Sequence, residues 1–284
     1  MAEVLLKGAQ AAGALSEALR SKAEELKAKG VVPCLAILRV GARGDDLSYE
    51  RGAMKRCEKI GIAVRQVVLD EGVTQEALLE EVRRLNEDAS VHGVLMFRPL
   101  PKHLDDEAVR AALAPEKDMD GITDGSMTAV YAGTKNGYAP CTAQACVELL
   151  KHYNIAVKGK RVVVIGRSLV IGKPVSLLLL AEHATVTICH SRSENLPEIC
   201  READILIVAA GKAGMIGAES VRAGQVVLDV GIHANADGTL GGDTRFAEVE
   251  PVVSAITPVP GGVGAVTTAV LASHVIEAAE KTVQ

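Results

Sequence analysis

The stretch RVVVIGRSLVIGKPVSLLLL, residues 161–180, has the pattern of a buried strand, a glycine turn and an apolar helix. Gly166 follows the strand, and Pro174 suits the first turn of the helix. Such a turn at the carboxyl end of a strand can present backbone N–H groups and a helix N-terminus to a phosphate. The spacing is not G-x-G-x-x-G, and an isolated glycine turn is about as often plain packing as a ligand site. The stretch therefore predicts a Rossmann-like unit, whose ligand must be argued from the neighbouring residues.

The next apolar run along the chain bears on that ligand. It ends at Cys189 and is followed by His190, Ser191 and Arg192, where a site for NAD typically has an Asp or Glu on the ribose hydroxyl. A hydroxyl and a guanidinium suit a ribose 2′-phosphate, which a carboxylate would repel. We therefore expect NADP as the cofactor. Glu194 is close enough in sequence to leave NAD open, and an ordinary solvated loop is the remaining alternative.

Apolar runs of strand length extend this pattern over the whole chain. They lie at residues 32–40, 62–69, 93–97, 161–165, 184–189, 204–209 and 226–230, and stretches of helical periodicity separate them. This alternation predicts an α/β protein with two domains, each with a mainly parallel sheet flanked by helices. We expect residues 1–138 and a C-terminal helix within 265–284 to form one domain. Residues 139–264 would form the Rossmann-like domain.

One helix of the first domain can be predicted in more detail. Thr74 is a suitable N-cap, and Leu78, Leu79, Val82 and Leu85 follow at positions i, i+1, i+4 and i+7, which predicts one buried stripe. We expect this helix to be scaffold.

Composition limits the class of protein. The 284 residues are 48% hydrophobic and 24% charged, which is enough for two α/β domains. A formal net charge of −5 argues against a nucleic-acid partner, because such binding needs a basic surface. Six cysteines without a C-x-x-C pair indicate reduced thiols, with neither a metal site nor a disulfide framework. No long uncharged apolar run and no basic leader is present, so we expect a cytoplasmic protein without membrane contact.

Four motifs occur together and in one order: PEKDMDGI (115–122), GYAPCTA (137–143), VVVIGRSLVIGKPV (162–175) and ITPVPGGVGAVT (256–267). With them the chain resembles the methylenetetrahydrofolate dehydrogenase/methenyltetrahydrofolate cyclohydrolase family over nearly its whole length. The resemblance implies a homodimer of two-domain subunits. It also implies that a folate binds between a catalytic domain and an NADP domain.

The resemblance assigns roles to individual residues. Asp120 would hold the pterin ring, and a carboxylate can indeed accept paired hydrogen bonds from an aminopyrimidinone edge. A turn or helix cap is the structural alternative for an Asp beside Gly121. The loop that closes on the substrate would be Pro260, Gly261, Gly262, Val263 and Gly264. The dinucleotide contacts would be Gly166, Arg167, Ser168, Ser191 and Ile232. Arg192 is added to them from the loop sequence after Cys189, because a guanidinium suits a ribose 2′-phosphate.

The chain departs from the family at the first catalytic helix. Family members usually carry Ser-x-x-Tyr-x-x-x-Lys there, and this chain keeps Tyr49 but has Ala53 in place of the lysine. The usual glutamine at the end of a nearby strand is Phe97. We expect Tyr49, Ala53 and Phe97 to line the folate site, and Tyr49 and Asp120 to be the catalytic residues.

The two reactions of the family make different demands. Hydride transfer to NADP⁺ needs the reactants held face to face, whereas hydrolysis of the methenyl cation needs proton transfer, typically worth about two to four powers of ten. The sequence therefore predicts oxidation of 5,10-methylenetetrahydrofolate to 5,10-methenyltetrahydrofolate, with weak or absent cyclohydrolase activity. A bifunctional enzyme that makes 10-formyltetrahydrofolate with a substitute such as Arg56 is the first alternative, although a guanidinium is a poor base. A catalytically inactive folate-binding protein is the second.

Overall fold

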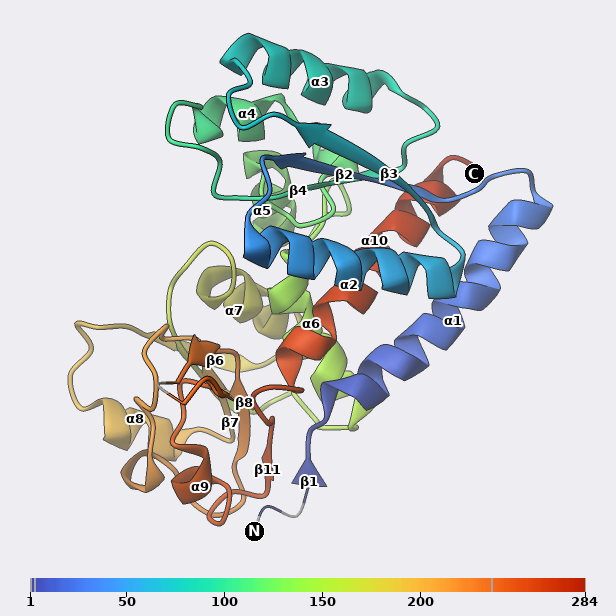
Figure 1. Cartoon of the computed structure of the whole chain (residues 1–284). Coiled ribbons are helices and arrows are strands. Elements are labelled where there is room, and N and C mark those ends of the chain that lie inside the picture. Colours follow the sequence, from blue (N-terminus) through green and yellow to red (C-terminus); the bar gives the residue numbers. More distant parts are fainter. Residues whose placement is uncertain (1, 3, 236, 284) are drawn as a thin grey trace. The chain divides into compact units, whose positions relative to one another are not determined.

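The computed structural model describes residues 2, 4–235 and 237–283 and divides into two compact units (Figure 1). The first unit comprises Ala14–Cys141 and Thr268–Gln284, and the second comprises Met1–Gly13 and Thr142–Thr267. The expected domains, 1–138 with 265–284 and 139–264, differ from these units most at the N-terminus. Their outermost positions, 1 and 284, lie outside the described residues.

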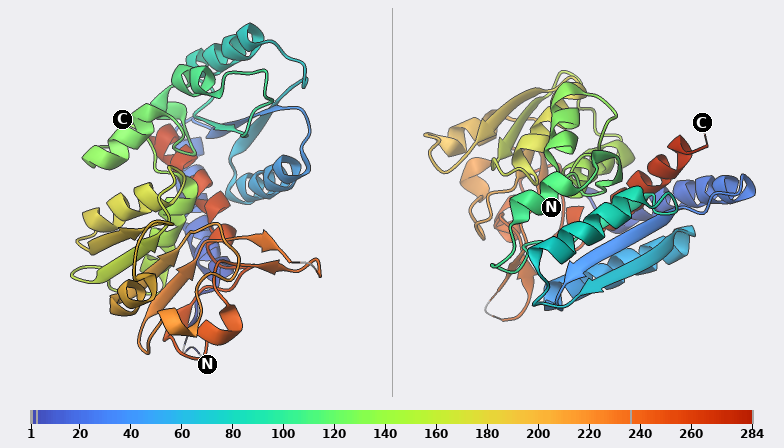
Figure 2. Two further views of the ribbon diagram at one scale, coloured as in Figure 1. Left: turned by 90° about the vertical axis from the view of Figure 1, so that its left-hand side faces the viewer. Right: turned by 90° about the horizontal axis from the view of Figure 1, so that it is seen from above.

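The second unit contains a sheet of six parallel strands, with helices on both faces (Figures 1 and 2). Their order is β1 (Val4–Leu5), β11 (Ala255–Ile256), β8 (Val226–Asp229), β7 (Ile205–Val208), β5 (Arg161–Ile165) and β6 (Thr185–Cys189). Its helices are α6 (Cys141–His152), α7 (Gly172–Ala181), α8 (Leu196–Glu202) and α9 (Phe246–Val249), and β9 (His233–Ala234) and β10 (Leu240–Gly241) form a small hairpin. The chain moves from β5 to β6 through α7 and back to β7 through α8. Right-handed crossovers in opposite directions therefore place α7 and α8 on opposite faces.

The difference in domain boundaries follows from β1. Val4 pairs with Ala255 and Leu5 with Ile256, so the first residues extend the sheet of the second unit. Helix α1 (Gly8–Ala28) begins in this unit and continues in the first.

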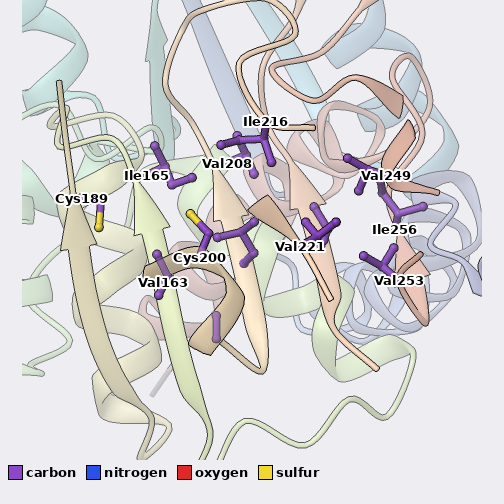
Figure 3. Close-up of a cluster of buried hydrophobic side chains, with 13 residues drawn as sticks. Val163, Ile165, Cys189, Cys200, Val208, Ile216, Val221, Val249, Val253 and Ile256 are labelled. Carbon is purple, nitrogen blue, oxygen red and sulfur yellow. The ribbon is translucent and has the colours of Figure 1, made fainter. Parts of the chain in front are cut away.

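The core on one face of this sheet is built almost entirely from aliphatic side chains (Figure 3). Val163 and Ile165 of β5 and Val208 of β7 are buried there, against Cys200 of α8 and Val249 of α9. Strands β5 and β7 are apolar along nearly their whole length, because helices cover both faces of a parallel sheet. Their carboxyl ends meet at one edge, which positions the loops that follow them.

The first unit is organised around a smaller parallel sheet. Its strands lie in the order β3 (Ala63–Leu69), β2 (Cys34–Val40) and β4 (Gly93–Met96), with α2 (Gly44–Ile60) and α3 (Gln75–Glu87) on opposite sides (Figure 1). Further helices are α4 (Asp106–Ala112), α5 (Asp124–Ala132) and α10 (Thr267–Lys281), which lies in this unit from Thr268 onward. A parallel bridge between Val94 and Asp118 connects the sheet to the KDMDG motif. The helix that follows β2 and the segment that follows β4 therefore begin at the same edge.

Helix α3 has the predicted cap and stripe. The Thr74 hydroxyl accepts the Ala77 N–H at 3.2 Å, and Leu78, Val82 and Leu85 are buried in the core of the unit. Leu79, expected in the same stripe, packs against this core and is only partly buried. Among the described residues, no helix combines the length and apolar character needed to cross a membrane.

Candidate active site

The turn between β5 and α7 depends on two glycines. Gly166 has φ +128°, and a Cβ built on it would lie 2.2 Å from the Ala209 carbonyl oxygen at the end of β7. A Cβ on Gly172 would lie 2.2 Å from the Gly166 carbonyl oxygen. Ser168 accepts the Lys173 N–H on its carbonyl at 3.1 Å and the Ile171 N–H on its hydroxyl at 3.3 Å. The missing side chains thus let the helix start directly against the turn, as a phosphate-binding turn requires.

The loop after β6 exposes the two side chains expected at the ribose. The His190 ring accepts the Arg192 N–H at 3.2 Å, and the Ser193 hydroxyl accepts the His190 N–H at 3.0 Å, so the loop is a tight turn. The side chains of Ser191 and Arg192 are exposed. Among the described residues, no ion pair involves the Arg192 guanidinium, which lies at the exposed surface of this loop.

Ile232 lies at the same edge of the sheet, after β8, and is 65% exposed. Its loop is fixed by the buried Asp229, whose carboxylate accepts the N–H of Gly231 at 3.0 Å. Next to Ile232, His233 Nε2 lies 2.6 Å from Asp243 Oδ1, and Asp243 Oδ2 accepts the Gly211 N–H at 2.9 Å. Asp243, which follows β10, thus contacts both β9 and the loop after β7. Sequence reasoning missed these contacts, because no local pattern links the three segments.

Two apolar side chains beside the phosphate turn were also missed. Leu169 is 51% exposed and Val170 57% exposed, directly after Ser168. Large apolar residues that remain exposed in a short turn are candidates for ligand contact. The signal in the sequence was that two apolar residues lie in the turn between β5 and α7, where neither element requires them for its buried face.

In the first unit, the structure brings Tyr49 and Phe97 together. Their ring centroids are 5.9 Å apart at an interplanar angle of 84°, an edge-to-face contact. The Phe97 N–H donates to the Leu38 carbonyl at 3.0 Å, which fixes Phe97 as a continuation of β4. Ala53 was expected to line the substrate site, but it is 0% exposed. The Ala53 methyl group belongs to the buried face of α2, so its expected place in the substrate site stays a prediction.

A buried polar network anchors the first turns of α2. Glu50, next to Tyr49, is 3% exposed, and its carboxylate accepts from Arg39 Nε at 3.0 Å and from Gln66 Nε2 at 2.7 Å. Asp46 lies one turn earlier on the same buried face, where burial raises the pKa of its carboxyl. The contacts with Arg39 and Gln66 pair the buried Glu50 carboxylate and so fix the position of the helix that carries Tyr49.

The two acids of KDMDG have different surroundings. The Asp118 carboxylate is buried and accepts the N–H groups of Ile122 at 3.0 Å and Thr123 at 2.8 Å. Asp120 is half-buried, and its Oδ1 accepts the N–H of Cys141, the first residue of α6, at 3.2 Å. Burial raises the pKa of Asp120 to about 6, opposed by its hydrogen bonds with Cys141. Asp118 thus holds the turn, and Asp120 has a cap-like contact as well as partial exposure.

Only part of the expected substrate loop is accessible. Pro260, Gly261 and Gly264 are exposed, whereas Gly262 and Val263 are buried. The Gly8 N–H donates to the Gly261 carbonyl at 2.8 Å, and a Cβ on Gly8 would lie 2.0 Å from the Gly262 carbonyl oxygen. The inner half of the loop is therefore packed against the start of α1, and direct contact with a ligand is restricted to the exposed positions.

The basic residues that follow Ala53 do not replace the lysine that family members usually have at position 53. Lys55 is exposed. Arg56 donates from Nη1 to the Ser16 hydroxyl at 2.9 Å and from Nε to the Thr268 hydroxyl at 3.4 Å. Arg56 thus ties α2 to α1 and α10. Across the part of the chain that the structure describes, no group of three or more His, Cys, Asp or Glu side chains could hold a metal ion.

Comparison with known proteins gives two family matches, which together span most of the chain. Residues 6–120 match the tetrahydrofolate dehydrogenase/cyclohydrolase catalytic domain, and residues 140–283 match the NAD(P)-binding domain of the same family. The chain belongs to the tetrahydrofolate dehydrogenase/cyclohydrolase family. It follows that the chain contains an NAD(P)-binding domain.

Individual relatives agree over the full length. The chain is 51% identical to the "Bifunctional protein FolD" of Clostridioides difficile strain 630 over 274 residues, which are 96% of each chain. Among solved structures, FolD from Campylobacter jejuni has a TM-score of 0.95 at 37% identity, covering 98% of this chain and 99% of that one. The Trypanosoma brucei dehydrogenase-cyclohydrolase, solved with NADP and an inhibitor, has a TM-score of 0.92 at 35% identity and covers 100% and 99%. The predicted two-domain α/β fold is confirmed.

Proposed function

We propose that the chain oxidises 5,10-methylenetetrahydrofolate to 5,10-methenyltetrahydrofolate with NADP⁺. The observation that carries this proposal is that the chain keeps the residues expected to position the folate and those expected to bind the dinucleotide. Tyr49 and Asp120 stand at the edge of the smaller sheet, and the glycine turn with Arg192 stands at the edge of the larger one. In this proposal the first unit is the catalytic domain and the second binds the dinucleotide.

The residues at the dinucleotide edge fit NADP. Gly166 and Gly172 leave backbone exposed where side chains would collide with the turn, which is what a pyrophosphate needs. Arg167, Ser168 and Ile232 would contact other parts of the cofactor. Ser191 offers an exposed hydroxyl and Arg192 an exposed guanidinium for a 2′-phosphate. The Trypanosoma relative was solved with NADP, which supports the same choice over NAD.

The residues of the catalytic domain would bind and orient the folate. NADP⁺, when bound, accepts the hydride. Asp120 in its carboxylate form accepts hydrogen bonds from the aminopyrimidinone edge of the pterin, so its pKa near 6 keeps it in the binding form at neutral pH. Tyr49, held edge-on by Phe97, offers an aromatic face to the ligand. Pro260, Gly261 and Gly264 would allow the backbone to approach it closely. Positioning of this kind is what hydride transfer requires.

Hydrolysis of the methenyl cation distinguishes a bifunctional enzyme from one that is a dehydrogenase alone. The relatives are named bifunctional, so the comparisons favour an enzyme that also hydrolyses the methenyl cation to 10-formyltetrahydrofolate. They give no support to the prediction of weak or absent cyclohydrolase activity. That prediction rests on this chain's own residues: neither the buried Ala53 nor Phe97 can transfer a proton, and Arg56 is bound to two hydroxyl groups.

An absorbance assay with methylenetetrahydrofolate and NADP⁺ tests both points. Formation of NADPH establishes the dehydrogenase, and its absence despite folate binding would refute it. Methenyl decay at neutral pH that exceeds the enzyme-free rate would establish the bifunctional candidate. Decay at the enzyme-free rate would instead support the loss of hydrolysis. The same rates with NAD⁺ decide the cofactor.

We also infer a homodimer formed through the second unit. Among the described strands, β6 pairs only with β5 and is an edge of the sheet. Ile188 on this strand is 43% exposed, and Leu180 at the end of the adjacent α7 is 57% exposed. An unpaired edge beside exposed aliphatic side chains supports an interface there.

A further inference from the structure

His274 is a buried histidine that the proposed reaction does not use. It lies on α10 and is 6% exposed, and its Nδ1 is 2.8 Å from the Met119 carbonyl oxygen. A carbonyl only accepts, so Nδ1 carries a proton and donates. The contact spans 155 positions in sequence and ends on the residue before Asp120.

The Met119 carbonyl receives a second donor. Cys141 Sγ lies 3.3 Å from the same oxygen, and the Cys141 N–H donates to Asp120 Oδ1 at 3.2 Å. On its other side, the Met119 N–H donates to the Val94 carbonyl of β4 at 3.2 Å. Met119, the residue before Asp120, is therefore fixed to the sheet by its N–H and to α10 and Cys141 by its carbonyl.

The imidazole of His274 is itself held in place. The Tyr138 ring lies against it, with centroids 4.9 Å apart and planes tilted by 34°. The Tyr138 hydroxyl accepts from Lys281 Nζ at 3.2 Å, and that ammonium is 4.7 Å from the Tyr138 ring centroid. Burial lowers the pKa of His274, so the ring donates from Nδ1 as a neutral group. The donor thus has a fixed position and does not depend on a charge.

The packing around Gly121 shows how little freedom the segment has. Gly121 has φ +63°, and a Cβ on it would lie 2.6 Å from the Tyr138 carbonyl oxygen and from the Pro140 nitrogen. The backbone that follows Asp120 thus packs directly against the segment between Tyr138 and Cys141. A rotation of the Met119–Asp120 peptide could not be absorbed there and would move the Asp120 carboxylate.

We propose that His274 is a positioning residue for the folate site, which acts by fixing the Met119 carbonyl and through it the orientation of Asp120. This inference rests on the proposed function, because Asp120 is taken as the residue that binds the pterin. His274 touches neither substrate nor cofactor in this account. Its loss should therefore weaken folate binding specifically, and a donor of similar reach should restore it.

The matched pair of variants is His274→Phe and His274→Asn. Phenylalanine keeps a ring against Tyr138 but has no donor, whereas the asparagine amide can place an N–H close to the position of Nδ1. A lost hydrogen bond of ordinary strength corresponds to about a tenfold change. We expect His274→Phe to raise KM for methylenetetrahydrofolate about tenfold with KM for NADP⁺ within about twofold of wild type, and His274→Asn to recover most of that loss.

Three results would overturn the inference: an unchanged folate KM in His274→Phe, an equal rise of both KM values, or a His274→Asn variant as impaired as His274→Phe. If His274→Phe does not fold, as judged by thermal unfolding, Cys141→Ala removes the other donor and should raise the folate KM alone, by a smaller factor. Calorimetric titration with tetrahydrofolate gives the same comparison without turnover. A wild-type protein that binds tetrahydrofolate but makes no NADPH would count against the proposed function and leave this inference testable by binding.

Discussion

Replacing Asp120 with asparagine should stabilise the protein while it lowers dehydrogenase activity. The pKa of Asp120 is raised from 3.8 to about 6, chiefly by burial, so the folded state holds this carboxyl's proton more tightly than the unfolded state does. A shift of one pKa unit corresponds to about 1.4 kcal/mol. Keeping Asp120 ionised above pH 6 therefore costs the folded state up to about 3 kcal/mol, an upper limit for a half-buried group.

The pH dependence has a definite sign. Above pH 6 the carboxyl is ionised in both states, and the folded state bears the full cost. Below about pH 4 it is protonated in both states and the cost disappears. Asparagine is uncharged, has nearly the same shape, and can still accept the Cys141 N–H. We therefore expect Asp120→Asn to raise the free energy of unfolding by up to about 3 kcal/mol at pH 8, with the gain falling through pH 6 and vanishing near pH 4.

Urea unfolding followed by circular dichroism at pH 8, 6 and 4 measures this gain. Asp124→Asn is the matched control, because the Asp124 side chain is 93% exposed and its change should leave stability nearly constant at all three values. In the same preparation, Asp120→Asn should lose about a hundredfold in dehydrogenase kcat/KM, the equivalent of a charge-assisted hydrogen bond or two. A stability loss at pH 8, or a gain that does not change with pH, would refute the claim that burial raises the pKa of Asp120.

Three further changes test the remaining parts of the proposal. Ala53→Lys alone should restore little methenyl hydrolysis, and Ala53→Lys with Phe97→Gln should restore more; if neither gains any in the methenyl-decay assay, the account of what α2 lacks is wrong. Arg192→Ala should lower kcat/KM for NADP⁺ about ten- to a hundredfold and leave kcat/KM for NAD⁺ within about twofold, since only a 2′-phosphate needs the guanidinium. An equal loss with both cofactors would show that Arg192 does not recognise the 2′-phosphate. Ile188→Lys should convert a dimer into a monomer in light scattering, and a dimer that persists would place the interface elsewhere.

Much of the fold could be predicted because local patterns reflect burial. Continuous apolar runs marked the parallel strands, since helices cover both faces of such sheets, and Thr74 marked the start of α3 through its own hydroxyl. Strand ends were less certain. The run at 32–40 begins with Val32, which is 51% exposed, and β2 starts only at Cys34, because an apolar side chain does not by itself show whether a backbone is paired.

The domain boundary at the N-terminus could not be predicted in this way. Strand β1 has only two residues, and its partner, β11, lies some 250 positions away. No local periodicity can identify so short a strand, and its pairing depends on the completed sheet. Residues 1–13 consequently follow the second unit, although their sequence precedes the first.

At the candidate site, too, features formed by adjacent residues could be predicted from the sequence, and those formed by distant residues could not. The glycine turn and the KDMDG motif were visible because their residues are adjacent in sequence. The motif could not show that Asp118 holds the turn while Asp120 remains partly exposed. The contact of His274 with Met119 and the buried position of Ala53 depend on packing between elements that are far apart in the chain.

The network around Glu50 explains why a single substitution should not restore hydrolysis. Residues 50 and 53 are neighbours on one side of a helix, so a lysine amine at position 53 would come within reach of the Glu50 carboxylate. That carboxylate already binds Arg39 and Gln66, and Glu50 is 3% exposed. A lysine amine beside this buried carboxylate would be held in its protonated form. A base must be able to give up its proton, whereas this pairing opposes it. A hydrogen-bond partner for the lysine amine on the side of α2 away from Glu50, such as glutamine at position 97, would be needed to draw the amine toward the ligand. In this chain position 97 is instead occupied by the apolar ring of Phe97, in edge-on contact with Tyr49. Helix α2 of this chain is thus stabilised by an apolar contact on one side and a closed ion network on the other, an arrangement suited to holding a substrate still and not to moving its protons.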